Sequence, residues 1–184
     1  DNGRALETID EVGRSTKYYY NINNMISAVE DSKGQLTSYE YNARHQLIKT
    51  TFPNGLEHRQ AYDDYGNLTL SHQDIEGTTT YQYDAYGRMI AMTNAKGNRY
   101  AYQYNDEGLL IQQTDCSNKV LSYQYDEQDR IVGVVDALGQ QTRYQYNAHD
   151  QITHIIYADG RQESLEYDAQ GRLLSVIDPN QQKT

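Results

Sequence analysis

The chain has 184 residues, a length typical of one domain, and its 26 acidic and 16 basic side chains leave a net charge of −10. Leu, Ile, Val and Phe together number 33, a fraction typical of disordered chains, so the 19 tyrosines must supply the apolar surface of any folded core. The acidic charge disfavours nucleic acid, the lack of an apolar run of about 20 residues excludes a membrane helix, and we expect no signal peptide at the polar N-terminus.

A tyrosine recurs every 21 residues without insertion or deletion, which indicates a repeat protein. Asp or Asn follows each of these register tyrosines, and in six of the eight repeats another tyrosine lies two positions before. We expect a single array over residues 1–184, with a partial repeat at 1–17 and eight repeats from about 18 to 184. The register tyrosines are Tyr20, Tyr41, Tyr62, Tyr83, Tyr104, Tyr125, Tyr146 and Tyr167.

Each repeat begins with a predicted strand and turn. Tyr-x-Tyr has the alternation of a half-buried β-strand, and the following Asx-x-x-Gly is a β-turn sequence. The Gly position needs a residue that accepts positive φ, which fits its replacement by Asn24, His45, Asp129 and Asp150. These first turns are predicted at 22–24, 43–45, 64–66, 85–87, 106–108, 127–129, 148–150 and 169–171. Their principal turn residues are Asp63, Asp84, Asp126, Asp168, Gly66, Gly87, Gly108 and Gly171.

A second strand and a second turn complete each repeat. Segments such as 88–93 and 130–135 are rich in β-branched and aliphatic residues, and turn sequences such as 94–97 and 136–139 follow them. The chain is therefore predicted to be all-β, a meander of about 16 to 18 antiparallel strands that forms a curved, open sheet. We expect it to be a piece of a longer array, whose unpaired edges favour self-association.

The units Tyr81–Met89 (YQYDAYGRM) and Leu165–Leu173 (LEYDAQGRL) resemble the tyrosine-aspartate (YD) repeats of the recombination hot-spot (Rhs) family. This family includes polymorphic toxins, subunits of insecticidal toxin complexes, wall-associated proteins and teneurins. The resemblance implies a β ribbon that spirals into a hollow shell, which in the toxins encloses a C-terminal toxic segment. It also implies secretion or cell-surface delivery in bacterial competition or host attack, with the rest of the shell and the enclosed toxin as partners.

One family feature is matched only in part. The family's toxins carry a self-cleaving site with an Asp-Pro-x-Gly sequence, whereas this chain has Asp178-Pro179-Asn180-Gln181. The dipeptide falls where other repeats carry the second turn, and proline suits the second position of a turn. We therefore interpret these residues as a turn rather than as an autoproteolytic site, and no toxin domain is visible in the sequence.

The regular tyrosines favour cross-strand aromatic packing over a sugar-stacking surface. Five tyrosines break the pattern and are better candidates for surface binding, and we take the last four of them as possible binding residues: Tyr19, Tyr65, Tyr86, Tyr100 and Tyr157. They support an alternative function, a module that binds carbohydrate or a cell-surface protein. A glycan is therefore a candidate ligand.

Catalytic, cofactor and metal sites are not predicted. One Asp per turn is too few for calcium, and the five histidines lack metal-ligand spacing. The sequence has neither a nucleophile elbow nor a phosphate-binding glycine loop. Cys116, as the single cysteine, cannot form an internal disulfide.

Overall fold

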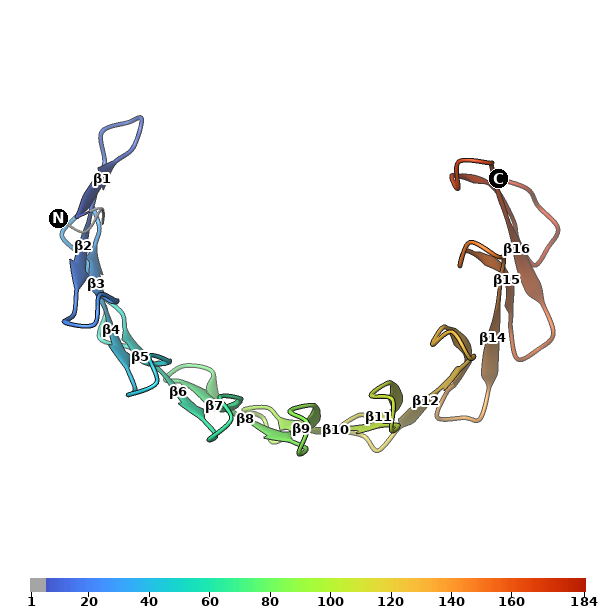
Figure 1. Ribbon diagram of the computed structural model, residues 1–184, viewed down its shortest axis with the longest axis horizontal. Helices are drawn as coiled ribbons and strands as arrows, with labels where there is room; N and C mark the ends of the chain where they lie inside the picture. The colour runs from blue at the N-terminus through green and yellow to red at the C-terminus, as the bar shows by residue number, and fades with distance from the viewer. Residues whose placement is uncertain (1–5) are drawn as a thin grey trace. The chain divides into compact units, whose positions relative to one another are not determined.

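The computed structural model describes residues 6–184 (Figure 1). The chain divides into two compact units. Unit 1 ends at Asn98 and unit 2 runs from Arg99 to Thr184, so the boundary falls at the end of a second turn. The described residues contain strands and turns and no helix, hence no helix that could cross a membrane. Residues 1–5, the start of the predicted partial repeat, lie outside this description.

The all-β prediction is confirmed, and the 17 strands fall within the expected number. Unit 1 contains β1 (Glu7–Ile9), β2 (Ser15–Tyr20), β3 (Ile26–Glu30), β4 (Leu36–Tyr41), β5 (Leu47–Thr51), β6 (Glu57–Tyr62), β7 (Leu68–Gln73), β8 (Gly77–Tyr83) and β9 (Met89–Thr93). Unit 2 contains β10 (Arg99–Tyr104), β11 (Leu110–Thr114), β12 (Val120–Tyr125), β13 (Ile131–Val135), β14 (Gln141–Tyr146), β15 (Ile152–Ile156), β16 (Gln162–Tyr167) and β17 (Leu173–Ile177).

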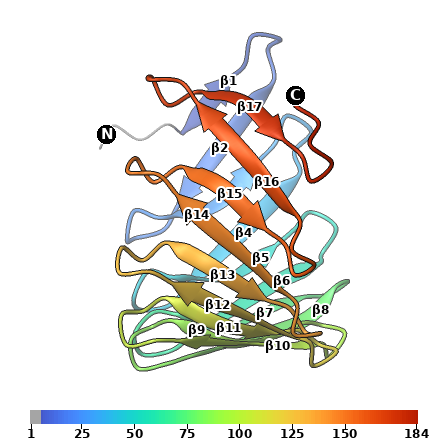
Figure 2. The ribbon, with the colours of Figure 1, turned by 90° about the vertical axis from the view of Figure 1, so that its right-hand side faces the viewer.

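Within each unit, every strand pairs antiparallel with the next strand along the chain. Figure 2 shows this alternation in unit 2, where the turns after β14 and β16 lie at one edge of the sheet and the turn after β15 lies at the other. Within the unit, the first turns of the repeats therefore lie along one side of the sheet, where the strands end, and the second turns lie along the opposite side.

The 21-residue period is visible in the strands themselves. The strands β11, β13, β15 and β17 begin at Leu110, Ile131, Ile152 and Leu173, each 21 residues after the one before. One departure occurs at β8, which begins at Gly77 because a shorter turn joins the paired residues Gln73 and Gly77.

Strand pairing extends closer to the first turns within a hairpin than it does between neighbouring hairpins. Within the β12–β13 hairpin it reaches Tyr125, opposite Ile131, and a β-bulge precedes this last pair. Between hairpins, the pairing of β11 with β12 stops at Gln112 opposite Ser122. Backbone pairing between repeats therefore ends before the strands reach the first turns.

Strand pairing places all the register tyrosines of one unit, here called the tyrosine ladder, on the same face of the sheet, here called the tyrosine face. In β14, Thr142, Tyr144 and Tyr146 are half-buried on this face, whereas Arg143 and Gln145 between them are exposed on the other. The tyrosines that we expected to supply the apolar surface of the core are only half-buried in these strands. Each unit by itself is a single layer of sheet, and among residues 6–184 no large side chain is fully buried.

Candidate functional site

Register tyrosines connect successive repeats through their hydroxyl groups. The hydroxyl of Tyr125 donates to the backbone carbonyl of Leu110, 15 residues earlier, at 2.7 Å. Tyr146 donates to Ile131 in the same way at 2.7 Å. The same bond, at 2.9–3.0 Å, joins Tyr41 to Ile26, Tyr62 to Leu47, Tyr83 to Leu68 and Tyr167 to Ile152. Each of these hydrogen bonds lies beyond the last backbone pair between two hairpins. It therefore extends the contact between successive repeats toward the first turns.

The environment of the ladder favours the neutral phenol. Burial raises the pKa of Tyr41, Tyr83, Tyr125 and Tyr146. The hydroxyl must keep its proton to donate to a carbonyl, so the raised pKa and the hydrogen bond act in the same direction. These tyrosines are structural donors at neutral pH.

The first turns are held by the carboxylate of the Asp that follows the register tyrosine. In the turn at 126–130, Asp126 Oδ1 accepts the backbone N–H groups of Gln128 and Arg130 at 3.0 Å, and Oδ2 accepts Arg130 Nε at 2.8 Å. The hydrogen bond from the Arg130 side chain is the main cause that lowers the pKa of Asp126. Asp63, Asp84 and Asp168 accept the equivalent hydrogen bonds. The recurrent Asp side chains therefore stabilise the turns in which they lie.

The fourth residue of each first turn has the positive φ that the sequence requires. Gly66, Gly87, Gly108 and Gly171 have φ between 79° and 96°, and the replacing residues Asn24, His45, Asp129 and Asp150 have φ between 60° and 71°. Gln181 also has positive φ, at 65°, and its N–H donates to the Asp178 carbonyl at 2.9 Å. The Asp178-Pro179 dipeptide therefore lies in a second turn, as predicted.

The structure separates the four candidate binding tyrosines. Tyr65 and Tyr86 lie at the tips of first turns in unit 1 and are exposed. Tyr100 and Tyr157 are half-buried in unit 2, near the second turns. A hydrogen bond with the Cys116 thiol raises the pKa of Tyr100, and a hydrogen bond to Glu163, at 2.7 Å, raises that of Tyr157.

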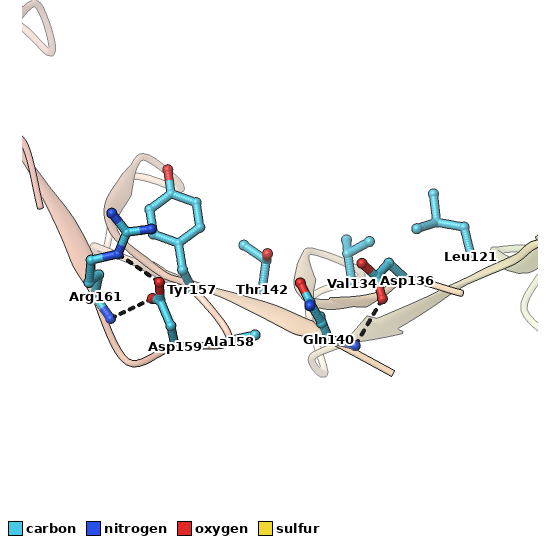
Figure 3. A pocket seen from close by; sticks show the side chains of 9 residues that line it. All are labelled: Leu121, Val134, Asp136, Gln140, Thr142, Tyr157, Ala158, Asp159 and Arg161. Atoms are coloured by element: carbon cyan, nitrogen blue, oxygen red, sulfur yellow. Dashed lines mark hydrogen bonds and ion pairs between the residues drawn. The ribbon is translucent and has the colours of Figure 1, made fainter. Parts of the chain in front are cut away.

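An open groove of about 680 Å³ runs along the tyrosine face of unit 2, on its second-turn side (Figure 3). Leu121, Val134 and Thr142 form its floor, because the tyrosine rings fill only the part of this face nearer the first turns. The groove is lined by Leu121, Val134, Asp136, Gln140, Thr142, Tyr157, Ala158, Asp159 and Arg161. Such an open surface can bind but does not exclude water from a reaction.

Tyr157 marks a local change in the repeat. Most second turns begin with Asp or Asn, whose carboxylate or amide oxygen accepts backbone N–H groups, as Asp136 accepts that of Gln140 at 2.9 Å (Figure 3). At position 157 this residue is aromatic, and Asp159 instead accepts the Arg161 N–H at 3.0 Å and Arg161 Nε at 2.7 Å. The substitution places an aromatic ring at the end of the groove while the turn stays closed.

Chemically reactive groups do not assemble in the described part of the chain. Within residues 6–184, no three His, Cys, Asp or Glu side chains come together as metal ligands. His58 Nε2 lies 2.8 Å from Ser71 Oγ on the tyrosine face, a pair that sequence inspection missed because its members belong to different strands. A nucleophile and a base also need a third group that orients the base, and the described residues supply no carboxylate bonded to His58.

Two family models match the chain. The model described as Teneurin YD-shell matches residues 111–184, and the model described as RHS Repeat matches residues 61–99. The chain therefore belongs to the Rhs/YD-repeat family, in agreement with the resemblance of its Tyr-Asp units. A structural role in a YD-type shell follows from this membership. No curated protein matches the sequence significantly.

Several solved structures are similar over most of the chain at low identity. The crystal structure of TcdB2–TccC3 shows 12% identity and a TM-score of 0.40, over 92% of this chain and 16% of that one. The Tc holotoxin pore of Photorhabdus luminescens shows 12% identity and 0.40, over 89% and 15%. A porin-like protein from Bacteroides uniformis shows 13% identity and 0.39, over 92% and 86%. The chain thus spans less than a fifth of the toxin chains, and the family assignment rests on the repeat models.

Two features of the site were not predicted from the sequence. The acceptor of each tyrosine hydroxyl could not be identified, because it depends on where the neighbouring hairpin ends. Links between first turns were also missed: Gln151 Nε2 donates to the Gly171 carbonyl at 2.8 Å, and Arg130 pairs with Asp150 at 2.7 Å. The recurrence of Gln or Arg five residues after the register tyrosine was the available signal.

Proposed function

We propose that this chain is part of the wall of an Rhs-type shell that encloses a toxin segment and helps to deliver it in bacterial competition or host attack. The observation that carries this proposal is the double connection between repeats. Backbone pairing joins each hairpin of a unit to the next, and the tyrosine hydroxyl extends the connection toward the first turns, as Tyr125 does with Leu110.

Such a wall acts by exclusion and not by reaction. A protease needs several residues of extended, unpaired backbone, and strands joined by short turns offer very little of it. The recurrent Asp side chains accept hydrogen bonds within the turns and the register tyrosines donate them between repeats, so the proposed role is structural and not catalytic. The partners are the rest of the shell and the enclosed segment, and the shell is secreted or delivered at the cell surface.

We also propose that the chain self-associates through an edge strand. Among the described residues of unit 1, β1 pairs only with β2, so one side of β1 is available to another strand. We expect the isolated chain to pair through such an edge with a second copy, as it would with the rest of a shell. Light scattering over a wide concentration range should show a mass that rises with concentration, and a strict monomer would count against it.

Enclosure is tested on the product of the complete reading frame that contains these residues. Limited proteolysis should leave a segment enclosed by the shell intact. The double variant Tyr125→Ala and Tyr146→Ala, which removes two hydroxyl bonds between repeats, should expose that segment to cleavage. Equal cleavage rates in the two proteins, with the wall folded in the parent, would refute enclosure.

A further inference from the structure

Two exposed tyrosines stand at the same position of consecutive first turns in unit 1. Tyr65 is 90% exposed and Tyr86 is 84% exposed, so neither ring contributes to packing within the sheet. The same turn position, three residues after the register tyrosine, holds no Tyr, Phe or Trp in the other repeats; its residues there are Asn23, Arg44, Glu107, Gln128, His149 and Gln170. The turn therefore has no need of a tyrosine here, and a pair of exposed phenol rings calls for another explanation.

Turn geometry fixes how the two residues leave the backbone. The Tyr65 N–H donates to Asp63 Oδ1 at 3.0 Å, and the Tyr86 N–H donates to Asp84 Oδ1 at 2.9 Å. The turns are closed by the Gly66 and Gly87 N–H groups, each 3.1 Å from the carbonyl of its turn Asp. Both tyrosines therefore project from the same backbone conformation.

The spacing of the pair follows from strand pairing. Tyr65 lies between β6 and β7, and Tyr86 lies between β8 and β9, with β7 paired directly to β8. Equivalent points of the two hairpins are two strand spacings apart, about 10 Å. The two turns are close neighbours, because a Cβ placed on Gly87 would lie 3.6 Å from Asn67 Oδ1 in the preceding turn.

Polar groups flank the pair and orient one ring. The Arg88 guanidinium lies 5.0 Å from the centre of the Tyr86 ring, while its Nε donates to Asp84 Oδ2 at 2.7 Å. On the other side, Arg44 donates to the Asp64 carbonyl and pairs with the Asp64 carboxylate at 3.5 Å. A ring held by a cation before binding loses less conformational freedom when a ligand stacks on it.

We propose that Tyr65 and Tyr86 form a binding platform for a neutral, β-1,4-linked polysaccharide. In such a polymer every second sugar ring presents the same apolar face, and the length of two linked rings matches the spacing of about 10 Å between equivalent points of the two turns. The apolar face of a sugar stacks on an aromatic ring, and its hydroxyl groups can bond to the flanking Arg and Asp side chains. The net charge of −10 argues against an acidic polysaccharide.

The platform would make this chain a carbohydrate-binding module, the alternative function that its sequence suggested. Binding at the platform does not require that the chain enclose a toxin. Its test is titration calorimetry with cellohexaose and chitohexaose, alongside cellobiose, which is too short to span both rings, and maltohexaose, whose α-1,4 links curve the chain. We expect at least one β-1,4 hexasaccharide to bind and the two comparison sugars to show no binding at the same concentrations.

Variants locate the site. Tyr65→Ala and Tyr86→Ala should each weaken binding roughly 3- to 10-fold, the range for one aromatic contact, and the double variant should abolish it. Tyr65→Trp should retain binding, and Leu138→Ala, which removes another exposed apolar side chain from a turn, should leave it unchanged. The proposal is overturned if neither hexasaccharide binds at millimolar concentration, if maltohexaose binds equally well, or if the tyrosine variants bind like the parent.

Discussion

Removal of one hydroxyl tests the tyrosine ladder directly. Tyr125→Phe keeps the ring but deletes the hydrogen bond of 2.7 Å to the Leu110 carbonyl. A single hydrogen bond contributes about 1 kcal/mol net, so the variant should lose about that much unfolding free energy. Tyr125→Ala also loses the packing of a half-buried ring and should cost about 2–3 kcal/mol, less than the truncation of a fully buried aromatic.

The matched control lies two residues away in the same strand and on the same face. Tyr123 is half-buried like Tyr125, but the described residues offer no hydrogen-bond partner to its hydroxyl. Tyr123→Phe should therefore change the unfolding free energy by less than about 0.5 kcal/mol.

A local measurement suits this comparison, because a repeat array can unfold in pieces. Hydrogen exchange of the β11 and β12 amides should become faster in Tyr125→Phe and stay unchanged in Tyr123→Phe, and urea denaturation followed by circular dichroism should give the total loss. Equal losses in the two Phe variants would show that the hydroxyl bond does not join the repeats.

Three further predictions concern charge and backbone conformation. The pKa of Asp126 is lowered, so its contribution to stability should be complete above the ordinary value of 3.8 and disappear as pH falls through the folded-state pKa; Asp126→Asn should weaken the acid dependence of the urea midpoint, and an unchanged dependence would contradict this. The pKa of Tyr125 is raised, so the contribution of Tyr125 to the unfolding free energy should be present below pH 10 and disappear as pH rises through the folded-state pKa. In an ultraviolet titration, Tyr125→Phe should lack one phenol that titrates late in the parent, and the assignment fails if the missing phenol is one that titrates early. Asp129 has φ of 61°, so Asp129→Gly should stabilise the chain by about 1 kcal/mol, whereas Gly87→Ala should destabilise it by a similar amount in thermal melts; the same sign for both would refute the argument from φ.

Local features could be predicted from the sequence because they depend on residues close together in the chain. The 21-residue period, the eight first turns and the positive φ at Asn24, His45, Asp129 and Asp150 all follow from the demands of a tight turn on its own residues. The Asp178-Pro179 turn was predictable for the same reason. The Tyr-Asp units also indicated the family that the repeat models show.

Tertiary structure decided what each tyrosine does, because that depends on the ends of neighbouring strands. A β-bulge and the early end of pairing between hairpins bring the Leu110 carbonyl within reach of Tyr125, and neither is visible in the Tyr-x-Tyr pattern. The same sheet leaves the register rings half-buried, because a single layer has no second layer to cover them. The first turns that carry the exposed Tyr65 and Tyr86 followed from the repeat alone, whereas the groove beside Tyr157 depends on side chains that several neighbouring strands bring together.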